Sequence, residues 1–211
     1  MSPVTANVFD EAMRPEASDF YRHTLQVMKE SGIPFLVGGT YATARYTGIV
    51  RPTKDLDVFV RPDDCGRMLD CLGTAGYLTE LTFSHWLGKA FHGDDFVDII
   101  FSSGNGIVTV DDGWIAHGVP AEVLGEEVLL CPVEETIWSK SFVCERERYD
   151  GADVHHLLRA CGPTLDWRRL IELVRRALRL LLSHLVLFDC LPGRPQPRAG
   201  VGAEGTAQPA G

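Results

Sequence analysis

Apolar residues in the first part of the chain follow two kinds of spacing, which predict alternating helices and strands. Helical spacing predicts helices over 19–31 and 62–75, and a shorter helix over 40–48 that ends at Gly48. Short apolar runs predict strands at 33–37, 56–60, 84–91, 95–101, 119–125 and 126–131. The third and fourth of these strands flank the segment "HGDD" and are expected to form a hairpin.

The pattern changes to helices alone from Pro132 onward. Two helices are expected at 132–148 and 150–162, because a proline and two acidic residues open the first of them. A third and longest helix is expected to run without interruption over 166–188, with leucines along one side.

These elements predict an α/β fold, with a small mixed β-sheet core flanked by helices and followed by a helical C-terminal part. The expected division is a core at 1–131, a helical region at 132–190 and a tail at 191–211. The tail is rich in glycine, proline and alanine, which cannot bury a core, so it is expected to be disordered.

Composition narrows the class of protein. The chain has 211 residues, 45% hydrophobic residues and a net charge of −9, which argues against a nucleic-acid-coating surface. Six cysteines without a CxxC pair indicate reduced thiols in a cytosolic protein. The N-terminus lacks a signal-peptide core and the most apolar stretch, 178–188, is short and flanked by arginines, so we expect a cytoplasmic protein without a membrane span.

Three aspartates lie in apolar surroundings where a charge is costly. Asp55 and Asp57 are two positions apart at the start of a strand, so their side chains share one face. Asp98 stands alone in "FVDIIF" and offers a third carboxylate from another strand; the alternative is a salt-bridged structural aspartate. Carboxylates that converge in this way suit Mg²⁺ with a substrate phosphate. Lys89 lies near the strand that carries Asp98, and we expect it to have a structural role.

Gly38 and Gly39 lie between a buried strand and a helix. Such a turn presents backbone N–H groups to an anion, and glycine allows a phosphate to approach closely. Thr40 adds a hydroxyl donor. This segment is therefore a candidate phosphate-binding turn.

The order strand, Gly38-Gly39, helix, "RPTKDLDVFV" and later Asp98 resembles the nucleotidyltransferase superfamily of DNA polymerase β type. Within it, the chain is similar to small bacterial toxin-type and antibiotic-modifying members. The resemblance covers residues 33–101 well and makes 1–131 the nucleotidyltransferase core. In the helical region the resemblance is looser. Lys140 matches a lysine that members of the family use near the nucleotide; the alternative for Lys140 is a solvated helix lysine. Asp153 matches a recurring helix aspartate.

The resemblance implies roles for these residues. Asp55, Asp57 and Asp98 would bind Mg²⁺ or Mn²⁺, and Asp98 would also accept the proton of the acceptor hydroxyl. The phosphates of an NTP such as ATP would be held by four residues: Gly38, Gly39, Thr40 and Lys140.

The implied activity is transfer of a nucleoside monophosphate from an NTP to an acceptor hydroxyl. Transfer RNA, a protein side chain and a small hydroxylated molecule all stay open as acceptors, and the toxin-type resemblance adds a possible antitoxin partner. The alternative is a catalytically inactive nucleotide-binding or toxin–antitoxin interaction protein, against which the intact aspartates argue. A DxD glycosyltransferase would need a longer nucleotide-sugar domain than the residues before Asp55 provide.

Overall fold

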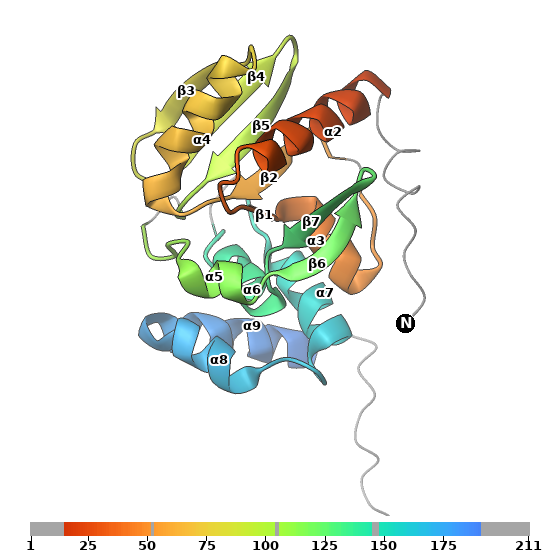
Figure 1. Ribbon diagram of the computed structural model, residues 1–211. Helices are drawn as coiled ribbons and strands as arrows, with labels where there is room; N and C mark the ends of the chain where they lie inside the picture. The colour runs from red at the N-terminus through yellow and green to blue at the C-terminus, as the bar shows by residue number, and fades with distance from the viewer. Residues whose placement is uncertain (1–14, 52, 104–105, 145–147, 191–211) are drawn as a thin grey trace, which may run out of the picture.

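A seven-stranded mixed sheet runs through the molecule in the order β3-β4-β5-β2-β1-β7-β6 (Figure 1). The computed structural model describes residues 15–51, 53–103, 106–144 and 148–190. The strands are β1 (Leu36–Val37), β2 (Leu56–Phe59), β3 (Leu78–Phe83), β4 (Leu87–His92), β5 (Asp95–Ile100), β6 (Val119–Val123) and β7 (Glu126–Leu130). The pairs β2–β5 and β1–β7 are parallel, and the other neighbouring pairs are antiparallel. The predicted α/β class with a mixed sheet is confirmed.

Two helices, α2 (Pro15–Glu30) and α4 (Pro62–Thr74), cover one face of the sheet. Pro62 opens α4 because a first-turn residue needs no N–H donor, and acidic residues in the same turn favour the positive helix end. Leu56 and Val58 of β2 are fully buried in this main core. Side chains alternate along a strand, so the residues between them point to the other face, where the candidate site lies.

The helix α3 (Gly39–Thr47) follows β1 directly and ends as predicted at Gly48, which adopts the left-handed conformation with φ 72°. Tyr46, near its end, packs against both the main core and a second buried cluster in the C-terminal helices. Its hydroxyl donates a hydrogen bond of 2.7 Å to the carbonyl of Cys131. The helix α3 therefore joins the sheet to the helical region.

The C-terminal part is helical, as predicted. Its helices are α6 (Val133–Ser141), α7 (Gly151–Cys161), α8 (Trp167–Leu173) and α9 (Leu178–Cys190). They share a core that includes Ile137, Val154, Leu157 and Leu170, all fully buried. Figure 1 shows α8 and α9 at the end of the molecule far from β3 and β4. The boundary between residues 131 and 132 stays a prediction.

The expected continuous helix over 166–188 is wrong. A short 3-10 turn, Arg175–Ala177, separates α8 from α9, and the Ala177 N–H donates to the carbonyl of Val174 at 2.6 Å. Val174 is buried and exposed arginines follow it, so the chain changes direction before the next buried residue, Leu181. A leucine-rich stretch is apolar on several sides, so its sequence does not show whether it forms one straight helix or two helices in different directions.

Other boundaries also differ from expectation. The helix expected over 132–148 ends at Ser141, and its last predicted turn includes residues 145–147, which are outside the described part. The pattern missed the strand β3 and the short helix α5 (Asp112–Ala116). The predicted tail at 191–211 also lies outside the described residues. Among the helices that are described, none has both the length and the apolar character to cross a membrane.

Candidate functional site

The carboxylates of Asp55, Asp57 and Asp98 converge on the sheet face opposite α4. In the parallel pairing of β2 with β5, Asp57 lies directly opposite Asp98. Asp55 is two positions before Asp57 and so points the same way. One carboxylate oxygen from each residue lies within 4.8 Å of the others. The structure thus brings together the three aspartates that the sequence singles out.

Burial and the neighbouring carboxylates raise the pKa values of Asp57 and Asp98. The pKa of Asp57 rises to about 7, first because its carboxyl is desolvated and then because Asp55 and Asp98 lie beside it. Burial also raises the pKa of Asp98, and the ammonium of Lys89 partly opposes that effect. Three hard oxygen donors that repel one another fit a divalent cation such as Mg²⁺ or Mn²⁺, which would remove the repulsion.

Two neighbouring side chains hold the outer carboxylates in place. The hydroxyl of Thr53 donates to Asp55 Oδ1 at 2.7 Å. Lys89 Nζ lies 2.5 Å from Asp98 Oδ1 and 4.2 Å from the ring centre of Phe96. Lys89 is therefore part of the site. The sequence indicated only a structural role for it. It is recognisable only from the β4–β5 register, which places Lys89 opposite Asp98.

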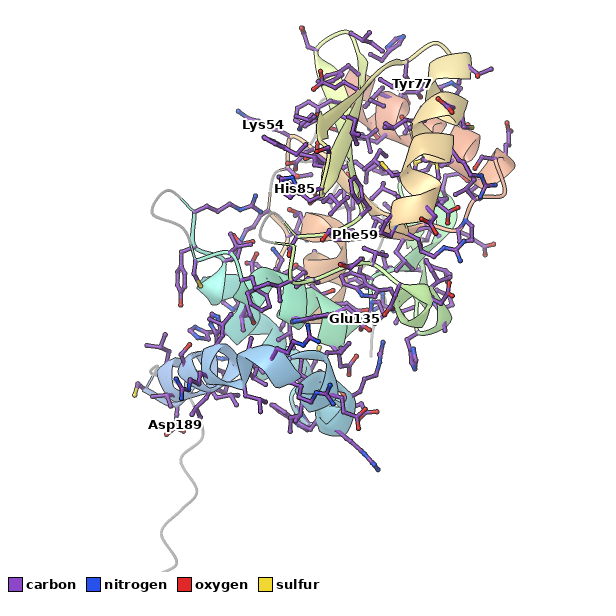
Figure 2. The ribbon with its side chains drawn as sticks, turned by 90° about the vertical axis from the view of Figure 1, so that its left-hand side faces the viewer. Lys54, Phe59, Tyr77, His85, Glu135 and Asp189 are labelled. Carbon is purple, nitrogen blue, oxygen red and sulfur yellow. The ribbon has the colours of Figure 1, made fainter. Side chains whose placement is uncertain are left out.

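The two glycines lie against the carboxylate cluster. The Gly38 N–H donates to the Asp57 carbonyl at 2.9 Å, and Gly39 has a φ of 52°. A Cβ at Gly39 would overlap the Asp57 carboxylate, and one at Gly38 would overlap the ring of Phe59, which Figure 2 labels. Both positions therefore require glycine. Their close approach places the N-terminus of α3, with Thr40 in its first turn, beside the aspartates.

Lys140 lies in an ion-pair network between α6 and α7. Its ammonium is 2.9 Å from Asp153 Oδ2 and 3.1 Å from Asp150 Oδ2, and its side chain is 12% exposed. Arg51 bonds the second oxygen of Asp153 at 2.8 Å, and Arg148 pairs with Asp150. The alternative of a solvated helix lysine is therefore wrong.

The positive charges of this network act on the aspartate cluster. Lys140 and Arg148 both lower the pKa of Asp57, against the larger effect of burial. Arg148 is not recognisable from the sequence, because nothing in its local pattern marks it. A narrow cavity of about 30 Å³ lies between α3 and α7 and is lined by Thr40, Thr43, Thr47, Ile49, Arg51, Asp153 and His156.

A separate group of charges ties α6 to α8. Glu135 is buried and bonds Arg169, and Glu134 accepts the Asp166 N–H at 3.0 Å. Figure 2 shows Glu135 among the C-terminal helices, whereas Lys54 and His85 project from the sheet. Burial raises the pKa of Glu135 to about 7, and Arg169 opposes that effect. We assign this group to packing of the helices rather than to the site.

Comparison with known proteins supports the fold. No protein-family model and no curated protein sequence matches the chain. The solution structure of the antibiotic-resistance factor ANT(2'')-Ia is similar with a TM-score of 0.53 and 17% identity, over 84% of this chain and 98% of that chain. The chain has the nucleotidyltransferase fold.

Further solved structures are similar at lower scores. The lincosamide antibiotic adenylyltransferase LnuA has a TM-score of 0.47 and 15% identity, over 74% of this chain and 98% of that one. A protein of Thermotoga maritima described as a putative nucleotidyltransferase has a TM-score of 0.44 and 14% identity, over 81% of this chain and 95% of that one. The match with ANT(2'')-Ia confirms, at the level of the nucleotidyltransferase fold, the resemblance inferred from the glycines and aspartates.

Proposed function

We propose that the protein is a metal-dependent nucleotidyltransferase, which moves a nucleoside monophosphate from an NTP to an acceptor hydroxyl. The observation that carries this proposal is the convergence of Asp55, Asp57 and Asp98 beside the Gly38-Gly39 turn. A phosphate-binding helix end and a three-carboxylate cluster are the two parts that such a transfer needs. The fold shared with ANT(2'')-Ia supports the same assignment.

The aspartates are the residues that would hold Mg²⁺ or Mn²⁺. When bound, such cations neutralise the triphosphate and polarise the reacting oxygens. Asp57 on β2 and Asp55 immediately before β2 offer two carboxylates, and Asp98 on the neighbouring β5 completes the set. Because burial and the neighbouring carboxylates raise the pKa of Asp57, cation binding and proton loss are coupled at this site.

The phosphates are expected to lie at the N-terminus of α3. The Gly38 N–H is held by the Asp57 carbonyl, so the backbone N–H of Gly39 and the hydroxyl of Thr40 are the donors on the sheet side, and Gly38 lets a phosphate approach closely. Lys140 and Arg148 supply positive charge from the helical side. Lys140 uses two of its three N–H groups on Asp150 and Asp153, which leaves one donor for a nucleotide.

Asp98 is the group expected to accept the acceptor's proton. Lys89 occupies its Oδ1, so Oδ2 is the atom that remains to receive the proton. As the acceptor oxygen bonds to the α-phosphorus, the bond from that phosphorus to pyrophosphate breaks, and the hydroxyl proton passes to Asp98. The inactive alternative is disfavoured, because all three carboxylates are present and within reach of one another.

The proposal is tested by transfer of label from each α-³²P-NTP in Mg²⁺. The acceptors are three separate pools: total RNA, total protein and small molecules from a cell extract. We expect label in one pool with one preferred NTP, none in EDTA and none from γ-³²P-NTP. The Asp57→Asn variant is the matched control, since it keeps the shape of the side chain. No transfer to any pool, together with NTP affinity that EDTA does not change, would overturn the proposal.

The acceptor stays open among RNA, protein and small hydroxylated molecules, and the labelled pool would identify its class. The antitoxin partner and the cytoplasmic location stay predictions from the sequence.

A further inference from the structure

Lys89 places a positive charge against the carboxylate cluster. Its Nζ lies 2.5 Å from Asp98 Oδ1, and the side chains of Lys89 and Asp98 are only 21% and 15% exposed. One oxygen from each of the three aspartates, Asp55, Asp57 and Asp98, lies within 4.8 Å of the others. The ammonium therefore adjoins the carboxylates that would hold Mg²⁺ or Mn²⁺, and salt in the solvent screens its charge only weakly at this burial.

The β-sheet and an aromatic ring hold Lys89 at this position. Lys89 lies opposite Asp98 in the β4–β5 register, and β4 is an inner strand that pairs with β3 on its other side. The ring centre of Phe96 lies 4.2 Å from Nζ and attracts the ammonium. Glu80 on β3 is the residue opposite Lys89 in register, but its carboxylate accepts a hydrogen bond of 2.8 Å from the Thr82 hydroxyl. Within the described ranges, Asp98 is the carboxylate that forms an ion pair with Lys89.

The order of the strands gives the cluster two sides. On the side of β1, Asp57 lies against Gly39, because a Cβ at Gly39 would overlap Asp57 Oδ2. The N-terminus of α3 lies there, and the phosphates are expected at that helix end. On the side of β4, Asp98 lies against Lys89. Asp98 is the group expected to receive the acceptor's proton, so the ammonium lies on the acceptor side.

Charge balance at the cluster favours one divalent cation. The ionised carboxylates of Asp55, Asp57 and Asp98 carry three negative charges and Lys89 carries one positive charge, so two negative charges remain. One divalent cation neutralises them. A second cation on Asp98 would have one carboxylate oxygen left to it and would lie beside the ammonium, where repulsion is strong because the site is partly buried.

We propose that the cluster takes one divalent cation, and that Lys89 takes the place of a second cation on Asp98, on the side of the acceptor. In sites with two metal ions, the ions stabilise the attacking and the leaving oxygen respectively. Here Lys89 is a positioning residue that supplies the positive charge beside Asp98 and holds its Oδ1, which leaves Oδ2 for the acceptor's proton. The inference rests on the proposed function and narrows its metal site to one ion.

Mn²⁺ binding to the full chain tests the number of ions. Equilibrium dialysis gives the ions bound per chain, and electron paramagnetic resonance distinguishes an isolated Mn²⁺ from an exchange-coupled pair, whose ions would be about 3.5–4 Å apart. We expect the parent at saturation to bind one Mn²⁺ with the spectrum of an isolated ion. An α,β-methylene analogue of each NTP should leave that ion uncoupled. Lys89→Met should bind two Mn²⁺ and give the spectrum of a coupled pair.

Lys54→Met is the matched control. It removes the same charge from an exposed lysine that precedes Asp55 in the sequence and that Figure 2 shows projecting from the sheet. This variant should keep one uncoupled ion. Asp57→Asn should lose the tightly bound ion, which separates binding at the cluster from Mn²⁺ on the acidic surface. Circular dichroism melts show whether the variants remain folded, and the count on the parent needs no variant.

A coupled pair of ions on the parent, with or without the nucleotide analogue, would overturn this inference, because a second cation would then have displaced Lys89. A single isolated ion on folded Lys89→Met would overturn it as well, because the lysine would not be what excludes the second ion. Both results leave the proposed transfer reaction intact. If the parent bound no Mn²⁺, or if Asp57→Asn bound it equally well, the proposed metal site and this inference would both be wrong.

Discussion

Lys89 and Asp98 form an ion pair across the β4–β5 hairpin, with 2.5 Å between Lys89 Nζ and Asp98 Oδ1. The ring of Phe96 lies beneath the same ammonium and limits its movement. One oxygen of Asp98 is thereby fixed, in a carboxylate that lies within 4.8 Å of those of Asp55 and Asp57. The pair orients the carboxylate, but its positive charge also opposes a cation at the site.

Replacing Lys89 with methionine should separate these two effects. Loss of one positive charge beside the aspartates should tighten Mn²⁺ binding by about thirtyfold, because a unit charge and a divalent cation about 4 Å apart repel by roughly 2 kcal/mol in high dielectric. The transfer rate should fall about tenfold or more, because Asp98 loses its orientation. Lys89→Arg is the control and should keep the Mn²⁺ affinity of the parent. Calorimetry of the metal-free proteins measures the affinity, and unchanged affinity in Lys89→Met would contradict this account.

Asp57→Asn should stabilise the metal-free protein while abolishing transfer. The change keeps the size of the side chain and removes repulsion from Asp55 and Asp98. We expect the melting temperature without metal to be equal to or higher than that of the parent, and transfer to fall by orders of magnitude. Added Mg²⁺ should stabilise the parent more than the variant, because only the parent binds it tightly. If Asp57 were a structural anchor, the metal-free variant would instead melt well below the parent.

The stability of the metal-free protein should fall as pH rises from about 4 to about 7. Folding raises the pKa of Asp57 from 3.8 to about 7, so in this range the folded state holds a proton that the unfolded state has lost. The stabilisation by this proton is complete below the pKa of the unfolded state, 3.8, and is lost as the pH rises through the pKa of the folded state, about 7. Denaturant unfolding measures the free energy of unfolding of both proteins at pH 5 and pH 8. From pH 5 to pH 8, the stability of Asp57→Asn relative to the parent should increase by on the order of 2 kcal/mol. A difference between the two proteins that is independent of pH would count against a raised pKa.

Gly39→Ala should disrupt the site, and Gly66→Ala should not. A Cβ at Gly39 meets the Asp57 carboxylate and also strains a backbone at φ 52°. We expect a loss of about 1–3 kcal/mol in stability and loss of metal binding. Gly66 lies within α4 with no atom near its missing Cβ, so alanine there should be neutral or stabilising by up to about 1 kcal/mol. Chemical unfolding of both variants measures the contrast, and equal stabilities would contradict the close approach at Gly39.

The parts of the site that the sequence predicts are those that stand out from their neighbours. Asp57 and Asp98 interrupt apolar strands, and Gly38-Gly39 separates a strand from a helix. Burying a charged side chain costs free energy, so the two aspartates indicate a functional site. The convergence of the three aspartates follows from strand periodicity and one parallel pairing. Lys89 carries no such signal, because a lysine on a strand is common and only the register places it against Asp98.

The helices and strands were predictable where apolar residues recur at one regular spacing, either helical or alternating. The helix α4 and the strands β6 and β7 have clear patterns and lie where expected. The strand β3 was missed because Leu78 and Phe83 on it are exposed, so its pattern does not alternate as a half-buried strand does. The turn between α8 and α9 was missed because the packing of Val174 and Leu181 on other helices decides the direction of the chain.

The pairing of Asp57 with Asp98 also sets an order of events during synthesis of the chain. The strands that carry them are parallel neighbours, and α4, β3 and β4 lie between them in the sequence. A chain emerging from the ribosome has Asp55, Asp57 and the glycines long before β5 exists. The third carboxylate arrives only after the intervening elements have been made and β5 has reached β2, a contact between distant parts of the chain. A nascent chain therefore lacks the complete three-carboxylate cluster, and under the proposed function a cation would stabilise the protein only after β5 has paired with β2.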